Sequence, residues 1–136
     1  MKKLAMISVG LALLLCLFGF AGCAKEEEHM EITYQQITAQ EAKSIMDTEK
    51  NYVIIDARTE EEFATGHIAG AILIPEYEIA QRAEAELPDK DALILVYCRS
   101  GRRSKIASEE LVKLGYTNVK EFGGIIHWPY EITTED

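Results

Sequence analysis

Basic residues are scarce in this chain, which has 14 Lys and Arg against 23 Asp and Glu and a formal net charge of −9. Such an acidic chain argues against nucleic acid, and against anionic lipid headgroups, as binding partners. The sequence also lacks internal repeats and low-complexity tracts, and 136 residues are enough for one domain and not for two. We therefore expect a single globular unit that binds no nucleic acid.

Charge is absent altogether from the segment Leu4–Gly22, which follows two lysines. A short apolar run after a positive start, ending in small residues, is typical of a secretory signal peptide. Its end resembles a bacterial lipobox, in which the cysteine after the small residues becomes the lipidated first residue of the mature protein; Cys23 holds that place. The chain departs from this pattern at Phe20, where leucine is usual.

The lipobox resemblance implies three parts: residues 1–22 as a lipoprotein signal peptide, 23–30 as a charged tether, and 31–136 as the folded domain. We accordingly expect an exported protein, held at a membrane surface through a lipid on Cys23. The alternative is an uncleaved N-terminal helix that anchors the chain, which would place the domain at a membrane surface as well.

Cysteine is also rare, with only three in the chain. Cys16 lies inside the apolar leader and Cys23 is the expected lipid site, which leaves Cys98 alone in the domain. A lone thiol in an exported protein is either buried and inert or reactive. The residues next to Cys98 in the sequence distinguish between these two roles.

Strand and helix patterns alternate from residue 31 onward. Thr38 with Glu41, and Thr59 with Glu62, have the spacing of capping boxes that start helices. The expected strands are 32–37, 52–55, 71–74, 93–97 and 119–122, and the expected helices end near 47, 66, 86 and 114. This alternation predicts an α/β fold with a mainly parallel sheet and helices on both faces. Ligands of such sheets bind beyond the carboxyl ends of the strands, where Cys98 follows the most apolar strand.

The segment from Cys98 to Ser104, with the sequence CRSGRRS, carries the features of an anion-binding turn. Gly101 allows a tight turn, whose successive N–H groups can form a nest for an anion. The N-terminus of the following helix and three arginines add positive charge, and all of these favour thiolate over thiol. A cysteine at a strand end is often a small buried apolar residue, but three arginines and a glycine beside it speak against that role.

The loop CRSGRRS resembles the active-site loop of the rhodanese family. The stretch 54–75, with the sequence IIDARTEEEFATGHIAGAILIP, resembles a second motif of that family, and Gly123-Gly124 with Trp128 resembles its closing segment. The three motifs together span most of residues 31 to 130 in the family's order. The resemblance implies a rhodanese-like fold, a five-stranded parallel sheet between helices, and a sulfurtransferase activity.

The same resemblance implies a two-step reaction through a persulfide on Cys98. The thiol takes the outer sulfur of a small anionic donor such as thiosulfate, releases sulfite, and passes the sulfur to a thiophilic acceptor, cyanide or a thiol. No metal and no organic cofactor is needed, and nothing in the chain calls for an oligomer. The residues expected to hold the donor form the loop itself: Arg99, Ser100, Gly101, Arg102 and Arg103.

Other residues of these motifs are expected to support the site and not to react. Asp56 and Arg58 lie at a strand end near the same rim and are candidates for pairing with each other, with Glu62 or with a loop arginine. Ser104 is a further supporting residue. His67 is interpreted as a histidine bound to backbone in a turn in preference to a general base. Tyr97 is expected in the core, and Trp128 in the core or at its rim.

Two other functions remain as alternatives. One branch of the same fold hydrolyses phosphate esters, but such phosphatases need five residues between the cysteine and an arginine that grips the phosphoryl oxygens. Here that position is Ser104, and Arg103 comes one residue early, which favours sulfur over phosphorus. The other alternative is a non-catalytic or sulfur-carrier module that binds a partner protein; the presence of Cys98 argues against a non-catalytic module but leaves a carrier open.

Overall fold

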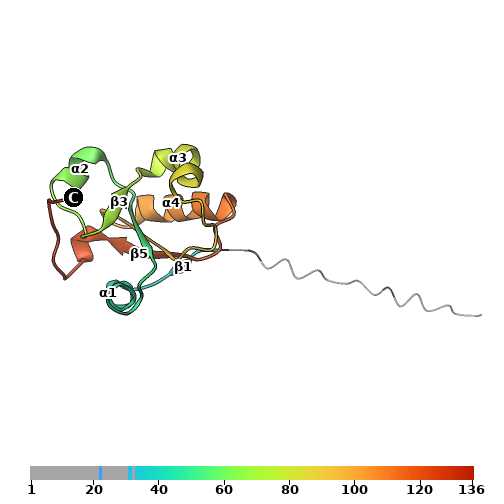
Figure 1. The fold of residues 1–136 in the computed structure, drawn as a ribbon, viewed down its shortest axis with the longest axis horizontal. Coiled ribbons are helices and arrows are strands. Elements are labelled where there is room, and N and C mark those ends of the chain that lie inside the picture. The colour runs from blue at the N-terminus through green and yellow to red at the C-terminus, as the bar shows by residue number, and fades with distance from the viewer. Residues whose placement is uncertain (1–21, 23–30, 32) are drawn as a thin grey trace, which may run out of the picture.

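The computed structural model describes Gly22, Glu31 and residues 33–136. The expected signal peptide, the tether and the lipid site Cys23 therefore lie outside the described residues. Five strands and four α-helices alternate along the domain (Figure 1). The strands are β1 (Gln35–Gln36), β2 (Val53–Asp56), β3 (Ala71–Leu73), β4 (Ile94–Cys98) and β5 (Val119–Gly124). The helices are α1 (Ala39–Thr48), α2 (Glu60–Ala64), α3 (Ile79–Glu86) and α4 (Arg102–Lys113), with 3-10 turns η1 (Glu76–Glu78) and η2 (Ile125–His127).

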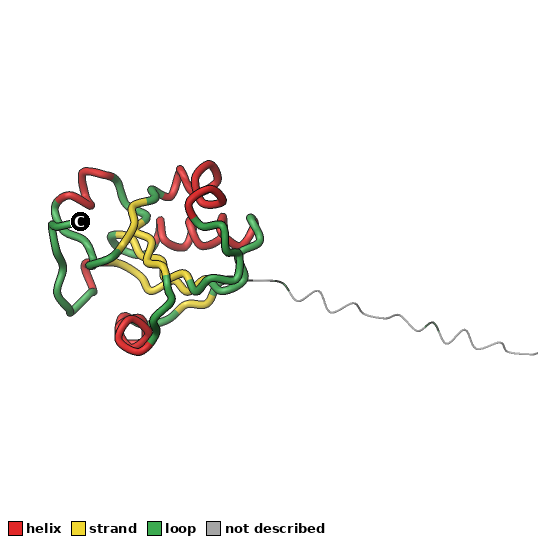
Figure 2. The backbone as a smooth tube through the Cα atoms, in the orientation of Figure 1, coloured by secondary structure: helices red, strands yellow, loops and turns green. Residues whose placement is uncertain are grey.

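The strands form one parallel sheet in the order β1-β5-β4-β2-β3. Helix α1 lies on one side of this sheet and α3 and α4 lie on the other, as the backbone trace shows (Figure 2). The α/β architecture expected from the sequence, a five-stranded parallel sheet with helices on both faces, is thus confirmed.

Strand β4 is the centre of the sheet, and all five of its residues are buried. Because side chains alternate along a strand, Ile94, Val96 and Cys98 pack with α3 and α4, whereas Leu95 and Tyr97 pack with α1. Two apolar cores therefore meet at β4, which explains why this strand has no polar face. Its carboxyl end carries Cys98 at the rim of the sheet.

Local signals placed both capped helices correctly. Thr38 caps α1 and Thr59 caps α2, and in each case the glutamate three residues on returns the hydrogen bond. A helix that starts this way satisfies backbone N–H groups that the helix itself leaves free. Both capping boxes are confirmed, including the one that involves Glu62.

Several strand ends differ from the expectations by one or more residues, most of all at the first strand. The first strand is only Gln35–Gln36, because its partner β5 is matched over those two residues. Helix α4 begins at Arg102, directly after Gly101. Its buried side is Ser104, Ala107, Ser108 and Leu111, while Ile106 and Leu114 are half-buried. Strand β5 continues through Gly124. Among the described residues, no helix is both long and apolar enough to span a bilayer.

Candidate active site

Cys98 is the last residue of β4 and is 1 % exposed. Its strand neighbour across the ladder is Gly124 of β5, after an irregularity in register between Val96 and Cys98. The sulfur thus lies at the carboxyl end of the central strand, on the α4 side of the sheet. This is the edge at which ligands of parallel α/β sheets bind.

The turn after Cys98 directs backbone donors at the sulfur. Gly101 has φ +108°, a left-handed conformation that side-chain-bearing residues rarely adopt, and its N–H donates to Cys98 Sγ at 3.0 Å. Helix α4 begins at the next residue, so its positive N-terminal end faces the same space. Four further amides of the turn donate to no acceptor within the described residues: Arg99, Ser100, Arg102 and Arg103. These donors remain free for an anion.

Gly124 allows this turn to lie directly on the sheet. A Cβ at Gly124 would overlap the carbonyl group of Arg99 and lie 2.5 Å from Cα of Ser100. The N–H of Ile126 in turn donates to the Arg99 carbonyl at 3.2 Å. Gly124, the last residue of β5, therefore has a physical role that its sequence did not reveal, which is to let the loop that carries the thiol lie against the sheet.

The three loop arginines lie in different environments. Arg99 and Arg102 are exposed, whereas Arg103 is partly buried and grips both oxygens of Glu62 at 2.7 and 2.8 Å. The hydrogen bonds from Arg103 hold the pKa of Glu62 at about 2, assisted by the backbone and side chain of Thr59. The hydrogen bonds to Glu62 raise the pKa of Arg103 in return. Among the three loop arginines, Arg99 and Arg102 are thus the two that remain available to bind an anionic substrate.

Asp56 and Arg58 form a second, fully buried cluster next to the site. Arg58 binds both oxygens of Asp56 and donates to the Gly66 carbonyl at 2.7 Å. Burial lowers the pKa of Arg58, but the hydrogen bonds and charge of Asp56 outweigh it, so the net shift is upward. Tyr97 donates its hydroxyl to Asp56 at 2.6 Å and accepts from the Ile68 N–H at 3.1 Å. Burial and then the charge of Asp56 raise the pKa of the Tyr97 hydroxyl.

This cluster satisfies the expectation that Asp56 pairs near the strand rim. It also shows that Tyr97 is more than core filling, because its hydroxyl joins β4 to the loop before β3. Every polar group in it is matched, and such closed networks hold backbone positions firmly. We read its role as fixing the carboxyl edge of the sheet.

Ser104 contacts the thiol, and behind it lies an acid that sequence reasoning missed. Cys98 Sγ is 3.3 Å from Ser104 Oγ, which is 2.6 Å from Oε1 of Glu121. Glu121 is 2 % exposed and also accepts from the N–H of Gly123 at 2.8 Å. The signal available was alternation: Val119 and Glu121 occupy the same face of β5, and a strand whose inner face begins with valine should continue with an apolar residue.

His67 is bound to backbone, as expected. Its ring nitrogens face the carbonyls of Phe63 at 2.9 Å and Glu135 at 3.1 Å, and the ring stacks on Phe63. It belongs to the contact between the α2 turn and the C-terminal segment. Trp128 is half-buried against Phe122, at the rim of the α1-side core.

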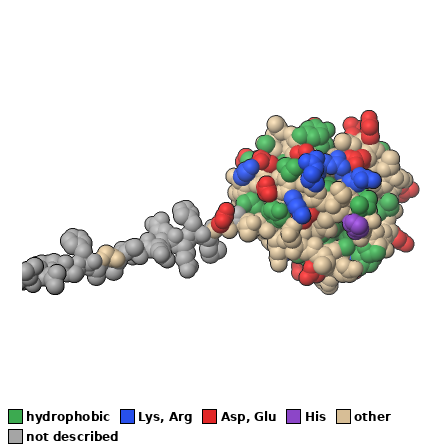
Figure 3. Space-filling view, turned by 180° about the vertical axis from the view of Figure 1, so that it is seen from behind, with side chains coloured by type: hydrophobic (Ala, Val, Ile, Leu, Met, Phe, Trp, Pro, Cys, Tyr) green, Lys and Arg blue, Asp and Glu red, His purple; other side chains and the backbone are tan. Residues whose placement is uncertain are grey.

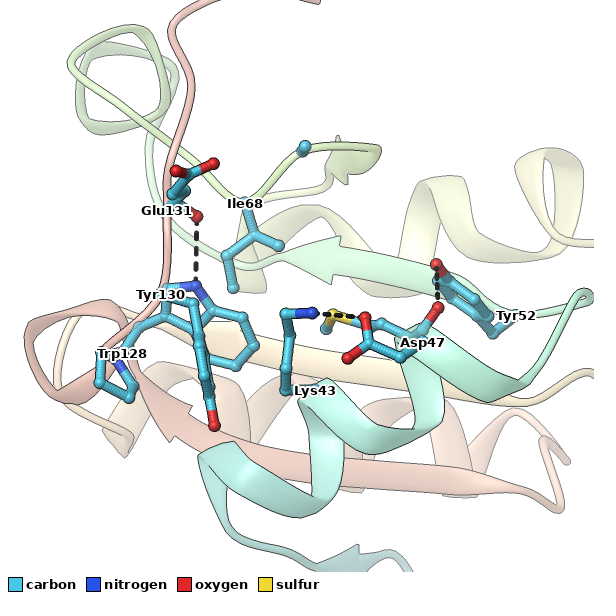
Figure 4. Close-up of a pocket in the computed structure, with 10 residues that line it drawn as sticks. Lys43, Asp47, Tyr52, Ile68, Trp128, Tyr130 and Glu131 are labelled. Atoms are coloured by element: carbon cyan, nitrogen blue, oxygen red, sulfur yellow. Dashed lines mark hydrogen bonds and ion pairs between the residues drawn. The ribbon is translucent and has the colours of Figure 1, made fainter.

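A pocket of about 630 Å³ lies away from the thiol. It lies between α1 and the C-terminal segment, and Figure 4 shows Lys43, Tyr52, Ile68, Trp128 and Tyr130 around it. Its polar groups bind each other: Lys43 pairs with Asp47, and the Trp128 indole N–H donates to the Glu131 carbonyl at 3.4 Å. None of the loop residues from 98 to 104 lines this pocket, so the candidate active site at Cys98 is separate from it.

Charge on the surface is unevenly spread. On the face seen in Figure 3, several Lys and Arg side chains lie close together with acidic side chains among them. Positive charge therefore gathers locally on a molecule whose net charge is −9. In the part of the chain that the structure describes, no group of three His, Cys, Asp or Glu side chains is placed to hold a metal ion.

Comparison with protein families now gives the site a context. The family described as "Rhodanese-like domain" matches residues 38–128, which include both the Asp56 cluster and the loop of Cys98. Thiosulfate sulfurtransferase PspE of Escherichia coli is 42 % identical over 71 residues, 52 % of this chain and 68 % of that protein. A sulfurtransferase of Allochromatium vinosum is 40 % identical over 88 residues, 64 % of this chain and 79 % of that one.

A longer relative and a solved structure extend the comparison. The adenylyltransferase and sulfurtransferase UBA4 of Candida albicans is 31 % identical over 107 residues, and the chain spans only 24 % of its length. A solved structure titled rhodanese with anions, from E. coli, is 36 % identical and has a TM-score of 0.58. The match covers 62 % of this chain and 99 % of that one.

Proposed function

Since this chain belongs to the rhodanese-like domain family, we propose that it is a sulfurtransferase that carries sulfane sulfur as a persulfide on Cys98. Its donor is a small anion of the thiosulfate type, and its acceptor is cyanide or a thiol. The curated relatives described above include sulfurtransferases that match over most of their own length. The proposal adds a donor class, an acceptor class and a residue to that general activity.

The observation that carries the proposal is the surroundings of the Cys98 sulfur. It receives one amide hydrogen bond from Gly101, and four unpaired amides with the exposed Arg99 and Arg102 lie in the same short turn. Donors of this kind hold an anion and stabilise negative charge that develops on sulfur. A thiolate surrounded in this way is a nucleophile suited to attack on another sulfur.

The two half-reactions balance without a further reagent. Cys98 thiolate attacks the outer sulfur of thiosulfate, a sulfur–sulfur bond to the cysteine forms, and the bond to the sulfite group breaks with its electron pair. Cyanide then attacks the outer sulfur of the persulfide, thiocyanate leaves, and the thiolate is restored. The family needs no metal or organic cofactor for this chemistry.

Ser104 speaks against the phosphatase alternative. It stands where a phosphatase of this fold would carry its arginine, and its hydroxyl is turned inward to Glu121 and away from solvent. Arg103, the nearest arginine, is held by Glu62. A phosphoryl group would therefore lack the bidentate partner that its transition state needs.

The deciding experiment offers the purified full chain two substrates. With thiosulfate and cyanide we expect thiocyanate, and we expect Cys98→Ser to abolish it; with an aryl phosphate we expect no phosphate release. Lys50→Gln, an exposed change on the turn between α1 and β2, is the matched control and should keep the wild-type rate. Phosphate release by the wild type would refute the proposal.

A sulfur carrier would behave differently in the same assay. It would form a persulfide on Cys98 when thiosulfate is supplied, visible as a mass gain of one sulfur, but would release it to cyanide or free thiols only slowly. If neither persulfide nor thiocyanate forms, the result would indicate a binding module without sulfur chemistry. The mass measurement therefore separates the three functions.

We also propose that the chain is exported and lipidated at Cys23, and that the mature protein is a monomer. The support is the apolar run up to Gly22, followed directly by Cys23 and a charged segment. Intact mass of the protein from a bacterial membrane fraction should show acyl chains on Cys23, and Cys23→Ser should lack them. A mature protein that retains Met1 would contradict the lipid anchor on Cys23 and favour the uncleaved helix.

A further inference from the structure

Three side chains of three kinds form a buried line behind the reacting sulfur. Cys98 is 1 % exposed, Ser104 is 0 % exposed and Glu121 is 2 % exposed. The Cys98 sulfur is 3.3 Å from the Ser104 hydroxyl, which is 2.6 Å from the Glu121 carboxylate. The residues come from β4, α4 and β5, so the line is a product of the tertiary fold.

The distances set the direction of the hydrogen bonds. Ser104 has one hydroxyl proton and three acceptors in range: Glu121 at 2.6 Å, the Gly101 carbonyl at 3.0 Å and the Gly123 carbonyl at 3.4 Å. A bond of 2.6 Å to a carboxylate is typical of the strong charge-assisted kind, so the Ser104 hydroxyl donates its hydrogen bond to Glu121. The Ser104 oxygen is then left to accept from the Cys98 thiol.

We propose that Glu121 is the proton partner of Cys98, reached through the Ser104 hydroxyl. When the S–H bond breaks, its proton goes to Ser104 Oγ while the Ser104 proton passes to Glu121. The pair changes from thiol and carboxylate to thiolate and carboxylic acid with no proton taken from or given to solvent. Glu121 acts as a positioning residue, since it touches the sulfur only through Ser104.

Both states of this relay keep their hydrogen bonds. After transfer, the Glu121 O–H donates to Ser104 Oγ and the Ser104 O–H donates to the thiolate, which also keeps the Gly101 N–H. Nothing in the chain of bonds is left unmatched in either state, so the site avoids the cost of a bare buried polar group. A route of this kind suits a thiol that is closed off from water.

The elements around β5 bring no compensating cation to Glu121. In the part of the chain that the structure describes, Glu121 forms no ion pair, and Arg103 of α4 is turned to Glu62. Tyr34, just before β1, has its pKa raised by burial and then by the charges of Glu109 and Glu121. Helix α1 packs on the other face of the sheet, where Lys43 is bound to Asp47.

This isolation has a measurable consequence for the pH dependence of the thiol. Two acidic groups that share one proton and repel each other when both are ionised titrate in two macroscopic steps. The first step creates some thiolate with Glu121 protonated; the second removes the shared proton against the charge of its partner. The alkylation rate of Cys98 should therefore rise with pH as a shoulder followed by a main step.

The test is the rate at which iodoacetamide alkylates Cys98, followed by mass spectrometry of the Cys98 peptide over a range of pH. Wild type should show the shoulder and the main step. Glu121→Gln, which keeps the shape and removes the proton site, should show one step, moved down by about one pH unit or more because the repelling charge is gone. Superimposable single-step profiles of the two proteins would overturn the proposal.

Ser104→Ala separates the relay from the mere presence of a charge. It removes the hydroxyl that donates to the thiolate when Glu121 holds the proton, so this state should lose population and the shoulder should shrink or vanish, while the main step should not move down. Glu109→Gln removes an equal charge from an exposed site on α4 and should retain the wild-type profile. If Glu121→Gln fails to fold, the comparison of Ser104→Ala with wild type still decides, since an unchanged shoulder would refute the relay.

The inference rests on the proposed function only in taking Cys98 as the nucleophile. Alkylation uses no sulfur donor, so the two ideas fail separately. A two-step profile without thiocyanate formation would keep the proton partner and refute the sulfurtransferase. Thiocyanate formation together with the same single-step alkylation profile in wild type and Glu121→Gln would keep the sulfurtransferase and refute the proton partner.

Discussion

Asp56 and Glu121 are both buried carboxylates, on the two strands that flank β4, yet their surroundings are opposite. Asp56 is paired across the ladder with Tyr97 and receives a bidentate arginine and a tyrosine hydroxyl. Glu121 is paired with Val96 and receives only a serine hydroxyl and an amide. One acid is paired with an arginine; the other has no positive partner among the described residues and lies one hydroxyl away from a thiol.

The contrast shows how one edge of a sheet can hold both a scaffold and a reactive group. A buried ion pair with every lone pair matched resists change, since either partner alone would be a bare charge in the interior. An acid held only by neutral donors can take up a proton with little disturbance. The four predictions below test this distinction by removing one group at a time.

The largest effect is expected from Asp56→Asn. The change strands the Arg58 guanidinium, which is 4 % exposed, without a counter-charge. Loss of one partner of a buried pair costs about 3–5 kcal/mol of unfolding free energy. Urea denaturation followed by circular dichroism measures it, and a loss below about 1 kcal/mol would show that the cluster is not a rigid support.

Tyr97→Phe should have the next largest effect. It leaves the Ile68 N–H and one oxygen of Asp56 without the tyrosine hydroxyl in a buried place. We expect a loss of about 1–3 kcal/mol, the usual cost of an unmatched buried group. Tyr52→Phe is the control, because that hydroxyl makes one long bond of 3.3 Å to the Met46 carbonyl. Equal losses in the two variants would contradict the special role of Tyr97.

Glu62 tests the intermediate case of a paired but partly exposed acid. Its pKa is lowered from 4.5 to about 2, so its contribution to stability is complete above the unfolded value of 4.5 and is lost as the pH falls toward 2. Glu62→Gln should lower stability by about 1 kcal/mol at neutral pH, because the side chain is 29 % exposed, and the difference should disappear once the pH falls below about 2. If the stabilities of the two proteins differ by the same amount from neutral pH down to pH 2, the ionised Glu62 side chain does not contribute to stability as predicted.

The smallest effect on stability is expected from Glu121→Gln. No cation is stranded, and the amide keeps the shape, so unfolding free energy should change by less than about 1 kcal/mol. Thermal melts of this variant beside Asp56→Asn give the comparison directly. A loss as large as that of Asp56→Asn would mean that Glu121 is structural and not an exchanger of protons.

Sequence reasoning succeeded where the cause is local. The capping boxes of Thr38 and Thr59, the strand that ends at Cys98 and the turn at Gly101 each depend on residues within a few positions. The family resemblance then supplied the number of strands and their parallel direction, while the strand order came only from the structure. Local patterns and one resemblance were thus enough for the architecture and for the position of the thiol.

Contacts between distant residues were out of reach. Arg103 was expected to hold substrate, but whether it would turn to Glu62 depended on how α2 sits beside α4. Glu121 lies 17 residues beyond Ser104, and only the closing of β5 against α4 brings them together. The role of Gly124 likewise needs the loop of Cys98 in place above it.

The parallel sheet also decides how the molecule faces its surroundings. Because the sheet is parallel, β1 begins at the edge opposite the one where β4 ends at Cys98. An attachment through the chain before β1 would therefore hold the domain at the amino edge of the sheet. The carboxyl edge, where the loop of Cys98 lies, would face away from the attachment. A protein fastened in that way could meet partners diffusing past a surface without turning around.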